Sequence, residues 1–570
     1  MTFTTKRWQV AAPITQEVER NLYDFHPVLR QILYNRGYTT LETASQFLSP
    51  RLIEEPEPAG MLGINQAVER IHRAIQRGEE IAVYGDYDVD GVTATALLTE
   101  ALQSLGASVR GYIPNRFEEG YGLNNEALES LHAEGVGLVI TVDCGIRSLE
   151  EAEHAQNLGL DLIISDHHHP GTELPHALAV INPKQHGDTY VEKDLAGVGL
   201  AYKLACAFMA ESSGGANSRR RPEDYLDLVA LGTVADLAPL KGENRVLVRA
   251  GLDCIRKQRR QGLQSLIGVS GINAQAISAT DIGFALGPRL NAAGRLDSAL
   301  AALTLLLSHD IQEAGLLAQK LEAQNRERQQ ITREIRAHAE QQAMGKDPDA
   351  LLLIAVDPGY NPGVVGLAAS RLVEQYYRPA IVAHQGEEFT RGSCRSIPEF
   401  HITQALDECA DLLVHHGGHA AAAGFTVRNA YLPVLVERLQ AIAAQCLGGL
   451  DLRPVLNADV ELPLSELKPK LLPYLDWLQP TGYGNPQAYF VSRDLKVVKS
   501  RTVGKEAAHL KLTVTDGRIH FDAIAFRQGF WQEQMPARVD LLYTFEINEY
   551  NGQTSLQLNV RDLKPAGAVD

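Results

Sequence analysis

The chain has 570 residues, 45% hydrophobic and 22% charged, with a formal net charge of −17. These proportions exclude a disordered or fibrous protein, and the length predicts several domains because one hydrophobic core seldom serves more than about 300 residues. The negative charge argues against a surface that is basic throughout, so any nucleic-acid contact must be local. No apolar run long enough to span a membrane and no Cys-x-x-Cys pair occurs, so we expect a cytoplasmic protein without a disulfide framework.

After an N-terminal segment, residues 1–60, apolar strand-like runs alternate with helix-like segments over residues 61–305. This alternation is typical of a mainly parallel sheet with helices on its faces. The runs EIAVYGD, GLVITVDCG and DLIISDHHH end in Asp86, Asp143 and Asp166. Ligands bind beyond the carboxyl ends of such strands, so three separate elements point to one place.

The rest of the chain predicts three further parts. Residues 306–346 lack proline and are rich in helix formers, which predicts one long helix that connects two domains, although a charged helix face can also be simple solvation. Residues 347–450 predict a smaller α/β unit. Residues 451–570 change to a period of two, with a hairpin signal at Asn551–Gly552, which predicts a small β-barrel.

The stretch GDYDVDG places Asp86, Asp88 and Asp90 at every second position after a strand. If the strand stays extended, the three carboxylates project to one side and repel each other. A divalent cation reverses this repulsion, because carboxylate oxygens are preferred ligands of Mg²⁺ and Mn²⁺. The alternative for this stretch alone is an Asp-rich surface turn.

Other residues favour the metal interpretation. Asp143, Asp166, His167 and His168 follow two further strands, and Asp236 stands among apolar residues, where an unpaired charge is costly. Carboxylates with one or two imidazoles suit a pair of Mn²⁺ or Mg²⁺ ions, which can activate water and hold both the entering and leaving oxygens of a phosphoryl transfer. We therefore expect two divalent ions as cofactors.

The motifs DYDVDG, VDCG, DHH and GTVADL occur in the order and spacing of the DHH phosphoesterase superfamily. The segments GPRLNAAGRLDSA and GGHAAAAGF resemble, within it, the RecJ family of single-stranded-DNA-specific exonucleases that degrade from the 5′ end. The resemblance covers roughly residues 60 to 570. It implies an α/β fold with a DHH domain built on a mainly parallel sheet, a long connecting helix, a smaller α/β DHHA1 domain and a C-terminal OB-like β-barrel.

The resemblance also assigns the metal centre. It implies as ligands Asp86, Asp88, Asp90, Asp143, His167 and Asp236. Asp143 would bridge the two ions and His168 would face the scissile phosphate, while Asp166 would orient a histidine, as ligating imidazoles usually require. We expect a structural role for His169, and Asn361 receives no role because many relatives carry a Trp-His pair there.

Substrate-binding residues are expected in four segments. They are Arg116 in IPNRFEEGYGL; Arg289, Asn291 and Arg295 in GPRLNAAGRLDS; Ser393 and Arg395 in RGSCRSIPEF; and His419 in HHGGHAAAAGF. The planar fork of arginine suits a terminal phosphate. The alternatives are an exposed loop arginine at 116, structural ion pairs at 289 and 295, and tight helix packing for the glycine and alanine run. We interpret the neighbours His415 and His416 as helical and leave them unassigned, and the basic run at 256–260 as solvated charge.

We therefore expect a metal-dependent exonuclease that removes nucleotides from the 5′ end of single-stranded DNA in recombination and repair. By the same resemblance, a single-stranded DNA-binding protein and a helicase are candidate partners, and a monomer is expected. One alternative is a DHH phosphodiesterase that acts on short oligonucleotides or cyclic dinucleotides. The other is a replication scaffold without catalytic activity, although every motif acid and histidine is present.

Overall fold

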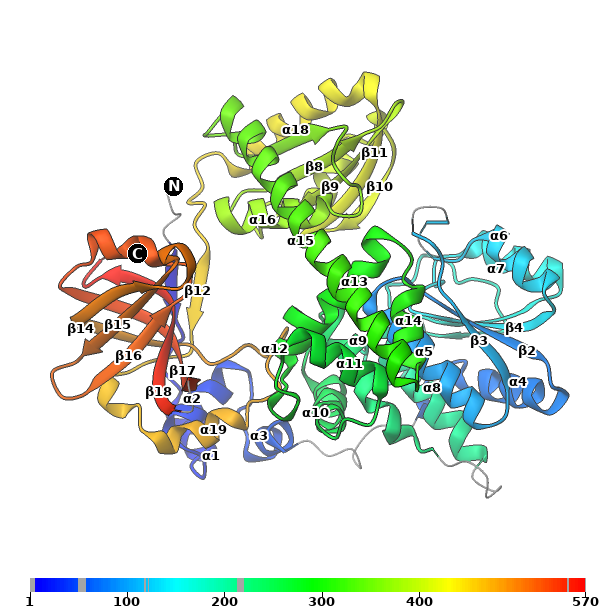
Figure 1. Ribbon diagram of the computed structural model, residues 1–570, viewed down its shortest axis with the longest axis horizontal. Helices are drawn as coiled ribbons and strands as arrows, with labels where there is room; N and C mark the ends of the chain where they lie inside the picture. Colours follow the sequence, from blue (N-terminus) through cyan, green and yellow to red (C-terminus); the bar gives the residue numbers. More distant parts are fainter. Residues whose placement is uncertain are drawn as a thin grey trace.

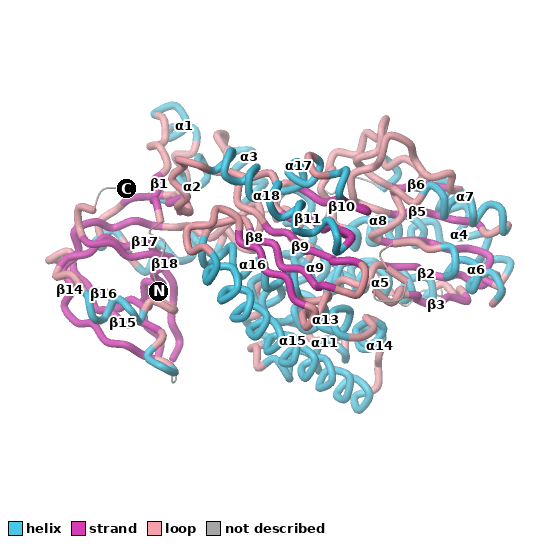
Figure 2. Tube along the Cα trace, turned by 90° about the horizontal axis from the view of Figure 1, so that it is seen from above, coloured by secondary structure: helices cyan, strands magenta, loops and turns pink. Residues whose placement is uncertain are grey.

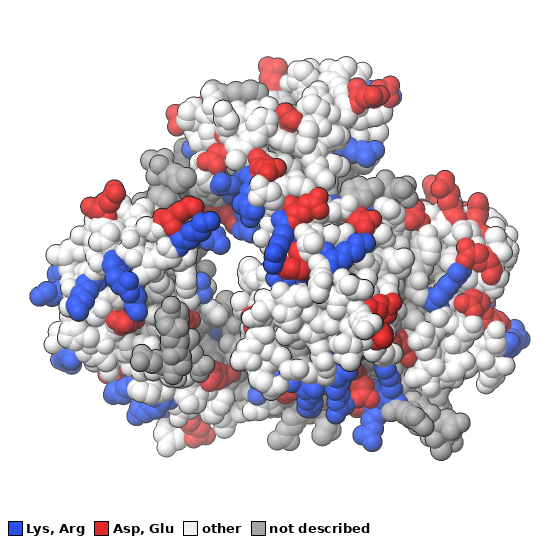
Figure 3. Space-filling view, in the orientation of Figure 1, with Lys and Arg blue, Asp and Glu red and all other residues white. Residues whose placement is uncertain are grey.

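The computed structural model describes residues 6–49, 58–116, 119–120, 122–212, 220–550 and 553–568. These residues form a larger α/β body, a smaller α/β body and a β-barrel, which surround an opening visible in Figure 3. Seen from above, the strands of the smaller body lie between the barrel and the strands of the larger body (Figure 2). The expected fold class is confirmed. Within the described ranges, no helix is both long and apolar enough to cross a membrane.

The larger body is built on a parallel sheet with the strand order β3-β2-β4-β5-β6. Its strands are β2 (Glu80–Gly85), β3 (Ser108–Tyr112), β4 (Val136–Val142), β5 (Asp161–Ser165) and β6 (Ala179–Ile181). Helices α4 (Ile64–Arg77), α5 (Val89–Ser104) and α8 (Gly197–Ser212) share one core with the sheet, and α6 (Asn125–Ala133) and α7 (Leu149–Leu158) share another. Both faces are covered, which explains the continuous apolar strands.

A helical layer completes the larger body and joins it to the smaller one (Figure 1). It comprises α9 (Leu226–Ala235), α10 (Gly242–Arg256), α11 (Gln261–Ser270), α12 (Ala279–Asp281), the π-turn η5 (Ile282–Leu286), α13 (Gly287–Leu296) and α14 (Leu300–Leu307). The expected long helix is α15 (Ile311–Lys346), whose 36 residues begin at an Asp310 side chain that caps the Glu313 N–H. It packs against α11, α13 and α14 at one end and α16 and β7 at the other, so it connects the two bodies.

The basic run at 256–260 is not simply solvated. Arg260 is buried and forms ion pairs with Glu100 (2.9 Å) and Asp227 (2.8 Å), which fix α11 against α5 and α9. The interpretation of this residue as solvated charge is therefore wrong.

The smaller body has a five-stranded sheet in the order β10-β11-β9-β8-β7. Its elements are β7 (Leu353–Asp357), α16 (Val365–Tyr376), β8 (Ala380–Gln385), β9 (Phe389–Arg395), α17 (Ile402–Asp407), β10 (Leu413–His419), β11 (Ala422–Arg428) and α18 (Leu432–Leu447). The segment HHGGHAAAAGF forms the hairpin β10–β11, so the helical interpretation of His415 and His416 is wrong. The His415 imidazole forms a hydrogen bond with the Thr426 hydroxyl, and the His416 imidazole forms one with the Asp407 carboxylate.

The C-terminal strands close into a barrel because β14 pairs with both β15 and β17. They are β13 (Val460–Glu461), β14 (Phe490–Val503), β15 (His509–Thr515), β16 (His520–Ala525), β17 (Arg538–Tyr550) and β18 (Gln553–Pro565). The Asn551–Gly552 turn lies outside the described residues. Phe490, Phe521, Tyr543 and Phe545 fill the barrel core, Trp531 packs against it, and Phe526 is exposed.

The N-terminal segment belongs to the same body as the barrel. Strand β1 (Arg7–Val10) pairs in parallel with β12 (Val455–Ala458), and helices α1 (Gln16–Asn21), α2 (Pro27–Asn35) and α3 (Leu41–Leu48) share a hydrophobic core with the barrel. Two ends of the sequence therefore build one structural unit.

Candidate metal centre and phosphate pocket

The acidic loop after β2 is shaped by the start of α5. Asp88 is the N-cap of this helix, and its carboxylate accepts hydrogen bonds from the Asp90 N–H (2.8 Å) and the Gly91 N–H (3.1 Å). An aspartate at this position satisfies backbone donors that the helix leaves free. Asp86, Asp88 and Asp90 thus lie on a turn and the first helical residues, so the chain does not stay extended through them.

Asp90 is tied to the start of a second helix. Its carboxylate accepts hydrogen bonds from Gly197 N–H (2.7 Å) and Val198 N–H (2.8 Å) in the first turn of α8, where the helix dipole favours negative charge. A side chain at Gly197 would begin 2.7 Å from the Asp143 Cβ, so this glycine lets α8 approach both acids. The two carboxylates are buried together.

Asp143 and His167 stand at the centre of the cluster. Asp143 follows β4 with a φ of 62°, and its Oδ1 lies 3.1 Å from the His167 Nε2. The same nitrogen is 3.9 Å from carboxylate oxygens of both Asp90 and Asp236. Asp86, Asp88 and Asp143 form another group, with ligand atoms within 4.8 Å of one another. The fold therefore brings together all six of the predicted metal ligands.

The pKa values show how costly this arrangement is without a cation. Burial, reinforced by Asp88, raises the pKa of Asp86 to about 8 and that of Asp236 to about 7. Burial and neighbouring carboxylates also hold the pKa values of Asp90 and Asp143 well above their usual range. Burial and His168 lower the pKa of His167 to about 3, which leaves its imidazole neutral and able to ligate.

The donor set fits divalent cations. Asp86 Oδ1, Asp143 Oδ1 and His167 Nε2 are buried and make no hydrogen bond, although the last two atoms lie 3.1 Å apart. Buried polar atoms in folded proteins are almost always partnered, and these three belong to oxygen and imidazole groups that Mn²⁺ and Mg²⁺ accept. The site is therefore chemically suited to metal ions.

Asp166 orients the His168 ring. It does not belong to any group of potential metal ligands formed by the described residues. Its Oδ1 lies 2.8 Å from His168 Nδ1 and accepts the His168 backbone N–H, and its Oδ2 accepts the Ile146 backbone N–H. Burial alone would raise the pKa of Asp166 and lower that of His168, but their hydrogen bond reverses both shifts. His169 is exposed, and its carbonyl accepts a hydrogen bond from Arg147.

An arginine cluster adjoins the acidic loop through Tyr87. The Arg116 guanidinium lies 4.9 Å from the centre of the Tyr87 ring, and Gly294 on α13 allows the helix backbone to approach Tyr87. Burial, together with Arg116, Arg328 and Arg395, lowers the pKa of Arg295 to about 10. Mutual repulsion among these partly buried cations would be relieved by a bound anion.

The second body contributes Ser393 and Arg395 from β9. A side chain at Gly366 on α16 would begin 3.1 Å from the Arg395 guanidinium and 3.5 Å from the Ser393 hydroxyl, so this glycine keeps both accessible. At the same junction, the Arg295 Nη1 donates to the Gly363 carbonyl (3.3 Å). The Asn361 side chain accepts the Gly363 N–H (2.8 Å), which gives it a turn-forming role.

Sequence reasoning missed Arg328 on α15. Its positive charge helps to lower the pKa of Arg295, and its guanidinium donates a hydrogen bond to the Asn325 side chain (2.8 Å). In the sequence it stands among many polar residues of a long helix, and no local signal separates it from them.

Three of the residues predicted to bind substrate do not belong to the arginine cluster. Arg289 is paired with Glu322 on α15 at 2.7 Å, which matches the structural alternative. Asn291 is half-buried on α13. His419 is exposed at the end of β10, where its carbonyl accepts the Thr403 hydroxyl.

Comparison with known proteins agrees with this geometry. Residues 80–233 match the DHH family, N-terminal domain, residues 349–448 match the DHHA1 domain, and residues 458–562 match the RecJ OB domain. A parallel sheet with acids at its carboxyl edge, followed by a second α/β body, defines a protein of the DHH phosphoesterase class.

Relatives place the chain within that class. The single-stranded-DNA-specific exonuclease RecJ of Bacillus subtilis is 39% identical over 562 residues, covering 98% of this chain and 70% of the relative. That of Escherichia coli is 36% identical over 560 residues, covering 95% and 96%. The crystal structure of Thermus thermophilus RecJ in complex with Mn²⁺ superposes with a TM-score of 0.85 at 32% identity, covering 99% of this chain and 80% of that one. The chain belongs to the RecJ family of single-stranded-DNA-specific exonucleases.

Proposed function

We propose that this protein hydrolyses single-stranded DNA from the 5′ end, in DNA recombination and repair, with two Mn²⁺ or Mg²⁺ ions as cofactors. The observation that carries the proposal is a buried acidic cluster with partnerless ligand atoms, directly beside a cluster of arginines. The first suits divalent ions and the second suits a strand end. Relatives named as single-stranded-DNA-specific exonucleases support the same conclusion.

The proposed metal ligands are Asp86, Asp88, Asp90, Asp143, His167 and Asp236. When bound between such groups, two divalent ions activate water and stabilise the entering and leaving oxygens of an in-line displacement. Asp143 is the proposed bridging ligand because its ligand atoms group with those of Asp86 and Asp88 as well as with those of both histidines.

His168 and the arginines act directly on the DNA in this proposal. Asp166 fixes the His168 ring and favours its protonated form, so His168 presents positive charge to the scissile phosphate. Arg116, Arg295, Ser393 and Arg395 bind the 5′-terminal phosphate, and Arg328 contributes to the same field. Because Tyr87 links the acidic loop to Arg116, the bound end and the cut bond lie close together, as exonucleolytic removal requires.

A nuclease assay tests the proposal. Single strands labelled at the 5′ end should release the label as short products from the first turnover in Mn²⁺, while 3′-labelled strands should shorten progressively and duplexes should persist. Asp143→Asn should abolish both signals. Release from the 3′ end first would contradict the assigned polarity, and a strong preference for dinucleotides would favour a short-oligonucleotide phosphodiesterase.

A further inference from the structure

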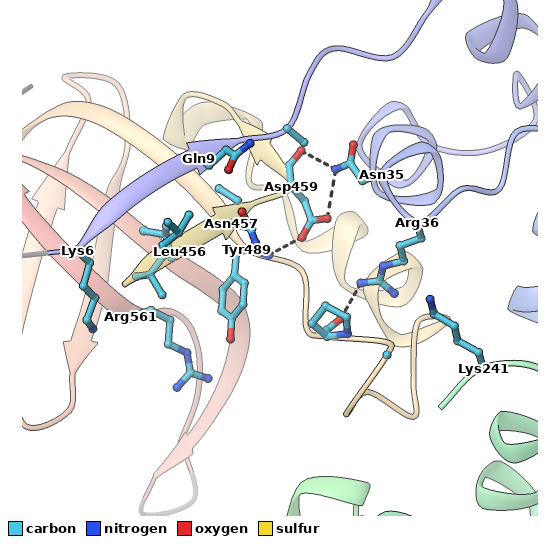
Figure 4. Close-up of a pocket in the computed structure, with 16 residues that line it drawn as sticks. Lys6, Gln9, Asn35, Arg36, Lys241, Leu456, Asn457, Asp459, Tyr489 and Arg561 are labelled. Atoms are coloured by element: carbon cyan, nitrogen blue, oxygen red, sulfur yellow. Dashed lines mark hydrogen bonds between the residues drawn. The ribbon is translucent and has the colours of Figure 1, made fainter. Parts of the chain in front are cut away.

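A pocket of about 770 Å³ lies where the N-terminal segment, the barrel and the larger α/β body meet (Figure 4). Cationic side chains from all three parts line it: Lys6 and Arg36 from the N-terminal segment, Lys241 from the start of α10, and Arg561 from β18. In the close-up, the Tyr489 ring extends between Arg561 on one side and Arg36 with Lys241 on the other. The metal centre and the arginine cluster do not use these residues.

The pocket is positive although the whole chain is negative. Asp459 is the one acid among the described residues that line it, so four cations and one carboxylate give the lining a formal charge of +3. Arg36 also donates to the Asn485 side chain and the Pro486 carbonyl, and Arg561 donates to the Gln487 side chain, which fixes these two cations at the pocket wall without neutralising their charge. The Asp459 carboxylate accepts the Asn35 side chain (3.2 Å) and the Tyr489 backbone N–H (3.0 Å), so its oxygens are engaged within the fold. A local positive site in a chain with a net charge of −17 indicates an anionic ligand.

A short loop connects this pocket to the metal centre. Lys241 follows Asp236 by five residues, so the two Cα atoms are at most about 18 Å apart. Within this loop Leu237 is 66% exposed, and the Leu240 N–H donates to the carbonyl of Tyr483, whose side chain is 63% exposed. Apolar and aromatic surface is thus presented to solvent between the two sites, as in stacking platforms for unpaired bases.

We infer that this composite pocket binds the single strand a few nucleotides downstream of the bond being cut. Phosphates contact Lys241, Arg561 and the N-terminal cations, and an unpaired base packs against Tyr489. The inference rests on the proposed function. It assigns a role to the N-terminal segment, which supplies two of the four cations and the β1 wall of the pocket. Aromatic surface between separated cations matches alternating bases and phosphates better than the side chains of an acidic peptide.

Equilibrium binding by the full-length protein in EDTA tests this inference without catalysis. Fluorescence anisotropy would compare a long 5′-phosphorylated strand with one of only a few nucleotides. The double variant Lys241→Gln, Arg561→Gln should bind the long strand less tightly and lower its logarithmic salt slope by roughly 1.4, because each phosphate contact contributes about 0.7. The short strand should bind as it does to the parent. Arg518→Gln, on the exposed turn between β15 and β16, is the matched control.

Tyr489 provides a second readout. Tyr489→Leu should weaken long-strand binding roughly tenfold, and Tyr489→Phe should restore it, because stacking needs the ring and not the hydroxyl. Unchanged affinity and salt slope for the long strand would overturn the inference, and saturable binding of an acidic peptide would then reassign the pocket. A failure of the proposed function would look different from a failure of this inference. In that case the parent protein would degrade neither strand, while anisotropy would still report binding.

Discussion

Asp86 is a carboxyl group whose protonation depends on whether a cation is bound. Folding raises its pKa to about 8, from about 4 in the unfolded chain, so the folded metal-free protein binds its proton more tightly. The contribution of Asp86 to the free energy of unfolding must therefore fall as pH rises from about 4 to about 8. Asp236, with a pKa of about 7, acts in the same direction.

Thermal unfolding in EDTA should show this as a midpoint that decreases across that pH range. Mn²⁺ should raise the midpoint most at the upper end, where protons no longer compete with the ion. Asp86→Asn should flatten the slope in EDTA. A midpoint for the parent in EDTA that stays level or rises between these pH values would contradict the raised pKa values.

Arg395 forms no ion pair with a carboxylate among the described residues, whereas Arg371 on α16 is exposed and paired with Glu374. Arg395→Ala should raise KM for a 5′-phosphorylated strand about tenfold or more, since a hydrogen bond to a charged group contributes about 1.5–3 kcal/mol. It should also reduce the preference over a 5′-hydroxyl strand. Arg371→Ala is the control and should leave both values unchanged; an equal loss in the two variants would argue against a terminal-phosphate role.

At this scale, the sequence predicts the metal cluster better than the arginine cluster. Asp86, Asp143 and Asp166 each follow a buried strand, so the parallel sheet itself gathers them. The partner of Arg289 could not be predicted, because Glu322 lies 33 residues away on another helix. Arg328 was missed for the same reason, since its neighbourhood is created by tertiary packing.

At the scale of elements, Gly91 shows how α5 holds the acidic loop. A Cβ at this position would lie 2.5 Å from the backbone N and O of Asp86, so Gly91→Ala must displace the loop. Activity should fall by about a hundredfold while the helix persists, because small misplacements of catalytic groups are costly. Steady-state kinetics with circular dichroism would check this.

Gly315→Ala is the control for that substitution. Gly315 lies in α15 with open space around it, so alanine should preserve activity and stabilise the helix by up to about 1 kcal/mol. Full activity in Gly91→Ala would show that the loop tolerates the displacement, which would contradict the role given to Gly91.

Elements also differ in how well their sequence predicts them. The 36-residue α15 was expected because its helix formers are uninterrupted by proline. The β10–β11 hairpin was missed because alanine and glycine give no periodic apolar pattern, and pairing with β9 decides its structure. For the acidic stretch, the sequence leaves open whether the strand continues or the chain turns into the helix, because the signal for helix capping at Asp88 is shared with ordinary turns.

At the scale of the molecule, Arg245 joins the larger body to the barrel body. This buried side chain on α10 donates hydrogen bonds to five carbonyl groups, those of Phe47, Trp477, Leu478, Gln479 and Pro480. Its guanidinium also lies 4.2 Å from the centre of the Phe47 ring. No sequence motif predicted this contact, because its partners are backbone groups of distant segments.

Arg245→Met should destabilise the barrel body by about 3–5 kcal/mol, because five carbonyls lose their donor at once. All three tryptophans, Trp8, Trp477 and Trp531, lie in that body, so tryptophan fluorescence during urea unfolding reports on it. Arg249→Met removes one hydrogen bond, to Leu48, and should cost about 1 kcal/mol. Equal unfolding midpoints for the two variants would contradict a special role for Arg245.

The central claim is that acids from separate strands and helices hold two divalent ions for cleavage. Anomalous diffraction from Mn²⁺-soaked crystals tests it most directly. The account predicts two manganese peaks, both within ligand distance of Asp143 and divided between the Asp86–Asp88 side and the Asp90–His167–Asp236 side. Peaks located elsewhere, or no peak at these residues at saturating Mn²⁺, would contradict it.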